Sequence, residues 1–310
     1  MSLRRALTAV PLALLVCAAA RAERVDVQPR WHVGDHVTYF MTEEITTGGA
    51  SIDEVLGGKA VTVVLDVIEA SRDGWLVTWR EVPRPDRGSA ATSDLSRARL
   101  EAAEVPMKLR LDVHGRLLEV VNWEQVRDRE LRWAEARRRY MEARHDPPSS
   151  IASQMYLARR HVESEAAVRE SYGDSPQALL VSVGHAYDSS APFDEVVRDA
   201  PDPATGRVTP ATQHFKLRVF DATSHLATLH VVQGTESSVM QERARTWKAA
   251  TFPVAGAAAS ASMAPLLPDA GMTCDARVDV RSGWPRSVRI DKTSIRAAVL
   301  FVQTKAFERR

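Results

Sequence analysis

Residues 272 to 281 read MTCDARVDVR, and this stretch decides the fold class because apolar and polar side chains alternate along all of it. Its apolar positions are Met272, Cys274, Ala276, Val278 and Val280. Successive side chains of a β-strand point to opposite faces, so this alternation predicts a strand with one buried and one solvated face. One-sided strands of this kind are typical of antiparallel sheets.

The same alternation recurs on both sides of the middle of the chain. Its apolar positions are Val37, Tyr39, Met41, Val61, Val63, Leu65, Val67, Trp75, Val77, Trp79, Met107, Leu109, Leu111 and Val113 in the first part, and Phe215, Leu217, Val219, Val288 and Ile290 in the last part. Turn signals such as Arg72-Asp73-Gly74 separate the segments. The pattern predicts a mainly antiparallel, curved sheet, either open or bent into a half-barrel.

A helical insert is expected at about residues 123–173, between the two groups of strands. Asn122 and Gln125 have the spacing of a capping box, and Pro147-Pro148 stop the helix, which predicts a first helix over 123–146. Val126, Trp133 and Tyr140 recur every seven residues and are expected on its inward face.

A second helix is expected over residues 149–173, ending at Gly173. Its expected inward positions are Ile151, Met155, Ala158 and Val162. Together these features predict an α+β fold in which two central helices pack on the sheet. Residues 23–310 are expected to form a single domain, because no linker separates two self-sufficient halves.

The first 22 residues have the three parts of an export signal. Arg4 and Arg5 precede an apolar run, and Ala20 and Ala22 supply small side chains for cleavage between Ala22 and Glu23. The run has about 15 residues, shorter than the roughly 20 of a membrane span, so no transmembrane anchor is expected after cleavage. The chain is therefore expected to be periplasmic or secreted.

The charge balance argues against nucleic acid as a partner, and the cysteine content argues against an intramolecular disulfide. Loss of the leader removes three arginines and no acid, which lowers the formal net charge from +1 to −2. This balance gives no electrostatic footprint for nucleic acid. Cys274 is the one cysteine outside the leader, so no intramolecular disulfide is expected, and its place on the apolar face predicts a buried, slow-reacting thiol.

Sequence motifs for catalysis, cofactors or metals are missing. The chain has no G-x-S-x-G, H-E-x-x-H, C-x-x-C or G-x-G-x-x-G, and Gly57-Gly58-Lys59 is interpreted as a hairpin turn. His32 and His36 flank a turn, so they do not share a helix face that could bind a metal. No catalytic residue, metal or cofactor is therefore assigned. Catalysis by residues from scattered segments stays open.

Aromatic side chains are the candidate ligand-binding residues. The candidates are Tyr39, Trp75 and Trp79 on the apolar strand faces, and Trp133 and Tyr140 on the helix stripe. The alternative is that these rings belong to the core, since large rings supply much of the buried area of any core. Trp79 is expected to be more exposed than Trp75, because Arg80, Glu81 and a Pro-rich loop follow it.

A resemblance to a group of uncharacterised secreted bacterial proteins rests on two motifs. One is the turn Asp279-Val-Arg-Ser-Gly-Trp-Pro285, a D-x-x-[ST]-G-x-P pattern in a C-terminal hairpin, and the other is Val33-Gly34-Asp35 before a strand. In overall plan the chain also resembles the bacterial periplasmic carriers of lipoprotein localisation. That resemblance implies a half-open barrel that holds acyl chains.

Three functions follow as hypotheses. The first is a periplasmic binding or envelope-associated protein that holds an apolar ligand or partner segment on the concave sheet face; its partners would be an apolar small molecule, a lipid or an envelope protein. The second is a secreted hydrolase, and the third is a structural interaction module without a ligand. A large apolar hollow would favour the first, a polar cleft with convergent acid, histidine and serine groups the second, and a filled core the third.

Overall fold

The computed structural model describes residues 23–48, 54–83, 101, 104–198, 210–234, 271–296 and 299–310. The expected leader, residues 1–22, lies outside these ranges. Within them the chain forms thirteen strands and four helices.

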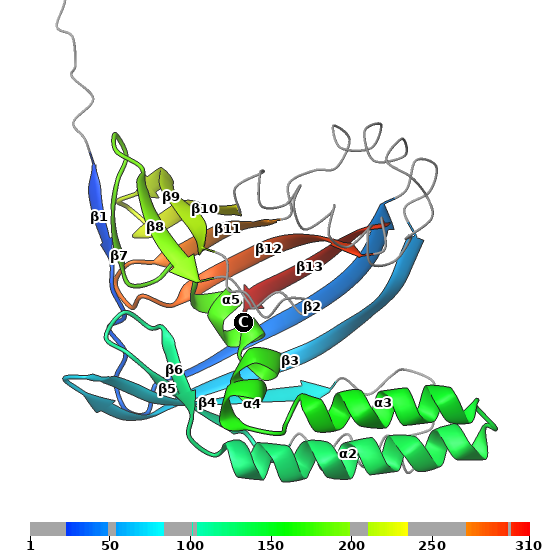
Figure 1. The fold of residues 1–310 in the computed structure, drawn as a ribbon. Helices are drawn as coiled ribbons and strands as arrows, with labels where there is room; N and C mark the ends of the chain where they lie inside the picture. The colour runs from blue at the N-terminus through cyan, green and yellow to red at the C-terminus, as the bar shows by residue number, and fades with distance from the viewer. Residues whose placement is uncertain are drawn as a thin grey trace, which may run out of the picture.

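Eleven of the strands form one antiparallel sheet with two free edges (Figure 1). In spatial order they are β6 (Leu117–Val120), β5 (Met107–Leu111), β4 (Gly74–Pro83), β3 (Glu54–Ser71), β2 (His36–Gly48), β13 (Val299–Arg309), β12 (Pro285–Arg296), β11 (Gly271–Asp279), β10 (Leu226–Gly234), β9 (Pro210–Asp221) and β8 (Phe193–Arg198). The expected α+β class with a mainly antiparallel, curved sheet is confirmed. The sheet is open and not closed into a barrel.

Sequence order explains this arrangement. The first five strands of the sheet and the last strands of the chain each form a series of hairpins, and β2 joins the two series by pairing with β13. The deciding stretch lies in β11, where Met272, Cys274, Ala276 and Val278 are buried and the residues between them face solvent. Burial raises the pKa of the Cys274 thiol, as the expected slow-reacting cysteine requires.

A second, small sheet and four helices accompany the large sheet (Figure 1). The small sheet pairs β1 (Arg24–Val27) with β7 (His185–Asp188). The helices are α2 (Trp123–Ala143), α3 (Pro148–Arg160), α4 (Glu165–Tyr172) and α5 (Asp174–Leu180). No helix in the described ranges is long and apolar enough to cross a membrane.

The first helix forms close to its expected range but ends at Ala143 and not at residue 146. The Asn122 side chain does not cap it by a hydrogen bond. Instead it accepts from the backbone N–H of Lys108 (2.7 Å) and donates to the carbonyl oxygen of Pro106 (2.9 Å). Asn122 therefore ties the start of α2 to the strand β5.

The expected second helix over 149–173 is wrong: three shorter helices occupy residues 148–180. Ser164 adopts an extended conformation and its hydroxyl accepts from the Ala167 N–H (3.2 Å), which starts α4 as a new helix. At the next break, a Cβ on Gly173 would lie 2.3 Å from the Arg169 carbonyl oxygen. Gly173 thus allows the tight turn from α4 into α5.

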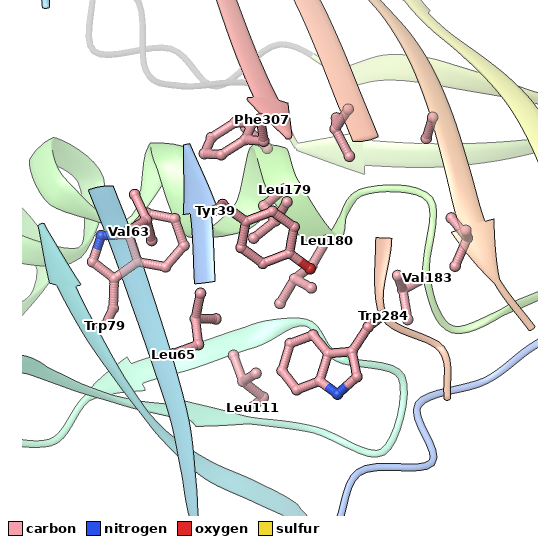
Figure 2. Packing of buried hydrophobic residues seen from close by; sticks show 14 of the residues in the cluster. Tyr39, Val63, Leu65, Trp79, Leu111, Leu179, Leu180, Val183, Trp284 and Phe307 are labelled. Atoms are coloured by element: carbon pink, nitrogen blue, oxygen red, sulfur yellow. The ribbon is translucent and has the colours of Figure 1, made fainter. Parts of the chain in front are cut away.

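The core fills the concave face beneath α5 (Figure 2). Leu179 and Leu180 of α5 belong to the same buried cluster as Tyr39 of β2 and Phe307 of β13. At the end of β12, the Trp284 ring stacks on Trp31 with 4.1 Å between ring centroids. The apolar half of the concave face is therefore occupied by the protein's own side chains.

The inward face of α2 is rotated from the expected stripe. Val126 is buried as expected, but Ala134 and Met141 are the other buried residues, while Trp133 is half-buried and Tyr140 is 41% exposed. The reason is that α2 packs mainly against α3 and α4, and Ala134 and Met141 lie on the side of α2 that faces α3. The helices α2 and α3 form a hairpin beside the sheet (Figure 1).

His185 should make stability depend on pH. Its ring lies 4.4 Å from the Phe215 ring, and burial, only partly offset by Glu195, lowers its pKa to about 4. In the unfolded chain the pKa of histidine is about 6.5. Between these values the unfolded chain binds a proton that the folded chain excludes, so stability falls as pH drops from about 6.5 to 4, by about 2 to 3 kcal/mol.

Urea unfolding of His185→Leu across this pH range measures the effect. The variant should lose this part of the pH dependence, whereas His32→Gln, at an 82% exposed side chain, should keep it. An unchanged pH profile in His185→Leu would contradict the burial of a neutral imidazole.

Candidate ligand-binding cleft

A cleft of about 610 Å³ lies between the concave sheet face and the helices. Its floor comes from β2, β3, β4, β5 and β13, and its walls come from α2, the end of α4 and the start of α5. Asp174 and Ser175, the first two residues of α5, separate the cleft from the apolar core that lies under Leu179 and Leu180.

A row of charged side chains crosses the floor. Lys305 of β13 pairs in register with Glu43 of β2, and Glu43 pairs with Lys59 of β3. The Lys59 Nζ lies 3.5 Å from a Glu43 carboxylate oxygen and 3.1 Å from one of Glu81. Burial lowers the pKa of Lys59, but Glu81 and Glu43 raise it more, so this ammonium stays charged at neutral pH.

The first residue of α5 extends this network to the helix. The Asp174 carboxylate forms ion pairs with Lys305 and Lys292. Burial by itself raises the pKa of Asp174. Lys292 and Lys305 together lower it by more, so the net pKa lies below the usual value. The Lys305 side chain is only 6% exposed, so the network holds α5 to β13 through a desolvated ammonium group.

Ser175 lies beside the same ammonium group. The Lys305 Nζ donates to the Ser175 hydroxyl at 3.1 Å, while Asp174 and Glu43 flank Lys305. This arrangement uses the lysine as a hydrogen-bond donor to the Ser175 hydroxyl. Among the described residues that line the cleft there is no histidine.

Apolar and aromatic side chains line the rest of the cleft. Val61, Trp79 and Met107 contribute from the sheet, and Trp133 contributes from α2. Next to Trp133, Arg129 and Glu130 form an ion pair with 2.6 Å between nitrogen and oxygen. The cleft thus combines a charged floor with an aromatic wall. Within the described ranges, no group of three or more His, Cys, Asp or Glu side chains could hold a metal ion.

The structure brings two of the five expected ligand-binding residues together in this cleft, Trp79 and Trp133. Tyr39 is a fully buried core residue, and its hydroxyl donates to the Pro285 carbonyl oxygen at 2.9 Å. Trp75 does not line the cleft; its indole donates to the Trp31 carbonyl oxygen. Tyr140 lies on the outside of α2, where the Arg144 guanidinium packs over its ring.

The expected order of exposure for the two strand tryptophans is wrong. Trp79 is 1% exposed, whereas Trp75 is partly buried. Trp79 lies between its register partners Leu65 and Met107 on the two neighbouring strands, and its ring edge faces Phe307 with 6.4 Å between centroids. The polar residues that follow it do not expose it, because β4 continues to Pro83.

The charged floor residues Glu43, Lys59 and Lys305 were not among the expected site residues. Their signal is present in the sequence. Glu43 follows Tyr39 and Met41 at the same two-residue spacing, so a strand that continues past Met41 must point Glu43 to the inward face. A polar residue at an inward position is more informative than another buried ring.

Comparisons with known proteins show a distant structural likeness. No family model matches the chain, and no curated protein matches it in sequence. A solved structure titled "Lipid-protein interactions in lipovitellin" is similar with a TM-score of 0.39 and 8% sequence identity, over 92% of this chain. This chain spans 25% of the lipovitellin chain. The likeness is too distant to support an argument about function.

Proposed function

We propose that the chain is an exported binding protein that holds an amphiphilic small molecule in the cleft between the sheet and α2. The observation that carries this proposal is the cleft itself, which has a volume of about 610 Å³. Its aromatic wall, formed by Trp79 and Trp133, lies next to the charged row of Lys59, Glu43 and Lys305. Ligand sites of proteins have volumes of roughly 300 to 1,000 Å³ and combine apolar walls with a few fixed polar groups.

The position of α5 argues against a wholly apolar ligand. The apolar half of the concave face is already covered by Leu179 and Leu180, and the open part has charged groups on its floor. A small apolar molecule can contact the aromatic wall alone, but one that extended over the floor would separate these charges from water without replacing any hydrogen bond. A ligand with one polar and one apolar part fits both surfaces.

Export supports the choice of a carrier or receptor. The expected leader, residues 1–22, would direct the mature chain to the periplasm or the medium, where amphiphilic molecules must cross water between membranes or enter from outside. A binding protein with a cleft protected on one side by helices suits that task.

Trp133→Ala should weaken binding of the neutral probe N-phenylnaphthylamine at least tenfold. The Trp133 ring lines the cleft from a helix that contributes little to the sheet core, so its loss removes contact area for the probe while the fold remains. A fluorescence titration of the probe measures the dissociation constant.

The matched control is Trp75→Ala, which removes the same kind of ring at a partly buried position outside the cleft. It should leave the dissociation constant of the probe within about twofold of the wild-type value, because a side chain that does not contact the probe acts independently of the binding site. Equal weakening by both variants, or no saturable probe binding by the wild-type protein, would overturn the proposal.

A further inference from the structure

A second, apolar groove opens between α2 and α3. It has a volume of about 200 Å³, and its apolar lining includes Ala134, Met141, Ile151, Met155 and Ala158. Met side chains adapt to ligands of different shape because they are flexible and polarizable.

The groove adjoins the cleft. Glu130, Trp133 and Tyr172 line both of them, so the two spaces share a wall at the middle of α2. A molecule that lies against Trp133 in the cleft is therefore directly beside the space between the helices.

The helix hairpin leaves its own apolar face incompletely packed. No residue of α3 is buried, and Ile151, Met155 and Ala158 are only half-buried against α2. A filled helix interface normally buries such positions, so the groove has room for an apolar chain.

The charges around the cleft determine which polar group fits. Glu43 pairs with both Lys59 and Lys305, and Arg129 pairs with Glu130, so both signs are present and each charge already has a partner. A singly charged polar group would match one partner and oppose the other. A zwitterionic group can interact with both.

We infer that the ligand is a zwitterionic amphiphile with a single alkyl or acyl chain, whose head group lies in the cleft and whose chain lies in the groove between α2 and α3. This inference rests on the proposed function, because it needs the cleft to be a ligand site. It adds the class of ligand and the place of the chain.

Calorimetric titration with octyl-, decyl- and dodecylphosphocholine, each below its micelle concentration, tests the chain. Each added methylene that enters the groove should tighten binding by roughly fourfold. Ala158→Trp fills the groove and should abolish this dependence on chain length. Ala152→Trp, at an exposed position of the same helix that does not line the groove, should preserve it.

Circular dichroism shows whether Ala158→Trp folds, and Ala158→Leu is a milder filling if it does not. Dodecyl sulfate and dodecyltrimethylammonium test the head group and should each bind at least tenfold more weakly than dodecylphosphocholine. The inference is overturned if either filled variant keeps the full chain-length dependence, or if a singly charged amphiphile binds as tightly. If N-phenylnaphthylamine binds at Trp133 but no alkylphosphocholine binds, only this inference fails. If neither binds, the proposed function fails with it.

Discussion

Replacing Trp79 by alanine should lower the free energy of unfolding by about 3 to 5 kcal/mol. The side chain is 1% exposed and lies in the central core, with Val63 and Phe307 nearby (Figure 2). Its removal leaves a cavity over β4, where the strands paired on both sides prevent collapse. Urea unfolding followed by circular dichroism measures the change.

Trp75→Ala is the control for this measurement. Trp75 is partly buried and packs with Trp31 near the start of β4, so its loss should cost less than that of Trp79. A loss below about 1 kcal/mol for Trp79→Ala would mean that this ring does not belong to the core.

Lys305→Met should lower the free energy of unfolding by about 2 to 4 kcal/mol. Methionine keeps the apolar stem but removes the ammonium group, which leaves Asp174 and Glu43 with one partner fewer in a buried setting. Breaking a buried ion pair typically costs 3 to 5 kcal/mol, and the remaining partner Lys292 offsets part of this for Asp174. The same urea unfolding assay detects the loss.

Arg110→Met is the matched control, because Arg110 and Glu119 form an ion pair whose side chains are 44% and 49% exposed. That variant should change stability by less than about 1 kcal/mol. Equal effects of Arg110→Met and Lys305→Met would show that the Lys305 network contributes no more than a surface pair.

The stability that the Lys305 network contributes should also depend on pH. The pKa of Asp174 is lower in the folded chain than in the unfolded chain, so its contribution is fully present above pH about 3.9 and is lost as pH falls through the folded pKa. In Lys305→Met, with one of the two lysines gone, this acid-induced loss should be smaller than in the wild type.

The strands were predictable because alternation is a local property of the sequence. The buried face of β11 follows from the positions of Cys274 and Ala276, and the buried face of β3 follows from those of Val63 and Leu65. The order of the strands, in which β2 pairs with β13 across the whole chain, depends on contacts that no local pattern contains.

The helices were less predictable because tertiary contacts decide where they break. Ser164 starts a new helix within an otherwise helical pattern, and the turn at Gly173 depends on packing against Leu117 of β6. The rotation of the α2 face, which exposes Tyr140, follows from a helix partner that the heptad spacing could not identify.

The site was predictable in part. Trp79 and Trp133 are expected ligand-binding residues because their rings lie on predicted inward faces, and the structure places both beside the cleft. Tyr39 has the same sequence pattern but lies beneath α5, where it is core. The polar positions Glu43 and Lys59 mark the point at which an inward strand face changes from core to cleft.

Fluorine NMR of the protein labelled with fluorotryptophan tests the central claim most directly, since the seven tryptophans report on the cleft and on the core at once. Each resonance is assigned by a tryptophan-to-phenylalanine variant, and N-phenylnaphthylamine is added to saturation. If a ligand binds in the cleft, the resonances of Trp79 and Trp133 should shift, while those of Trp31 and Trp284, stacked on each other outside the cleft, should not. Unshifted Trp79 and Trp133 at saturation, or shifts confined to Trp31 and Trp284, would contradict the account.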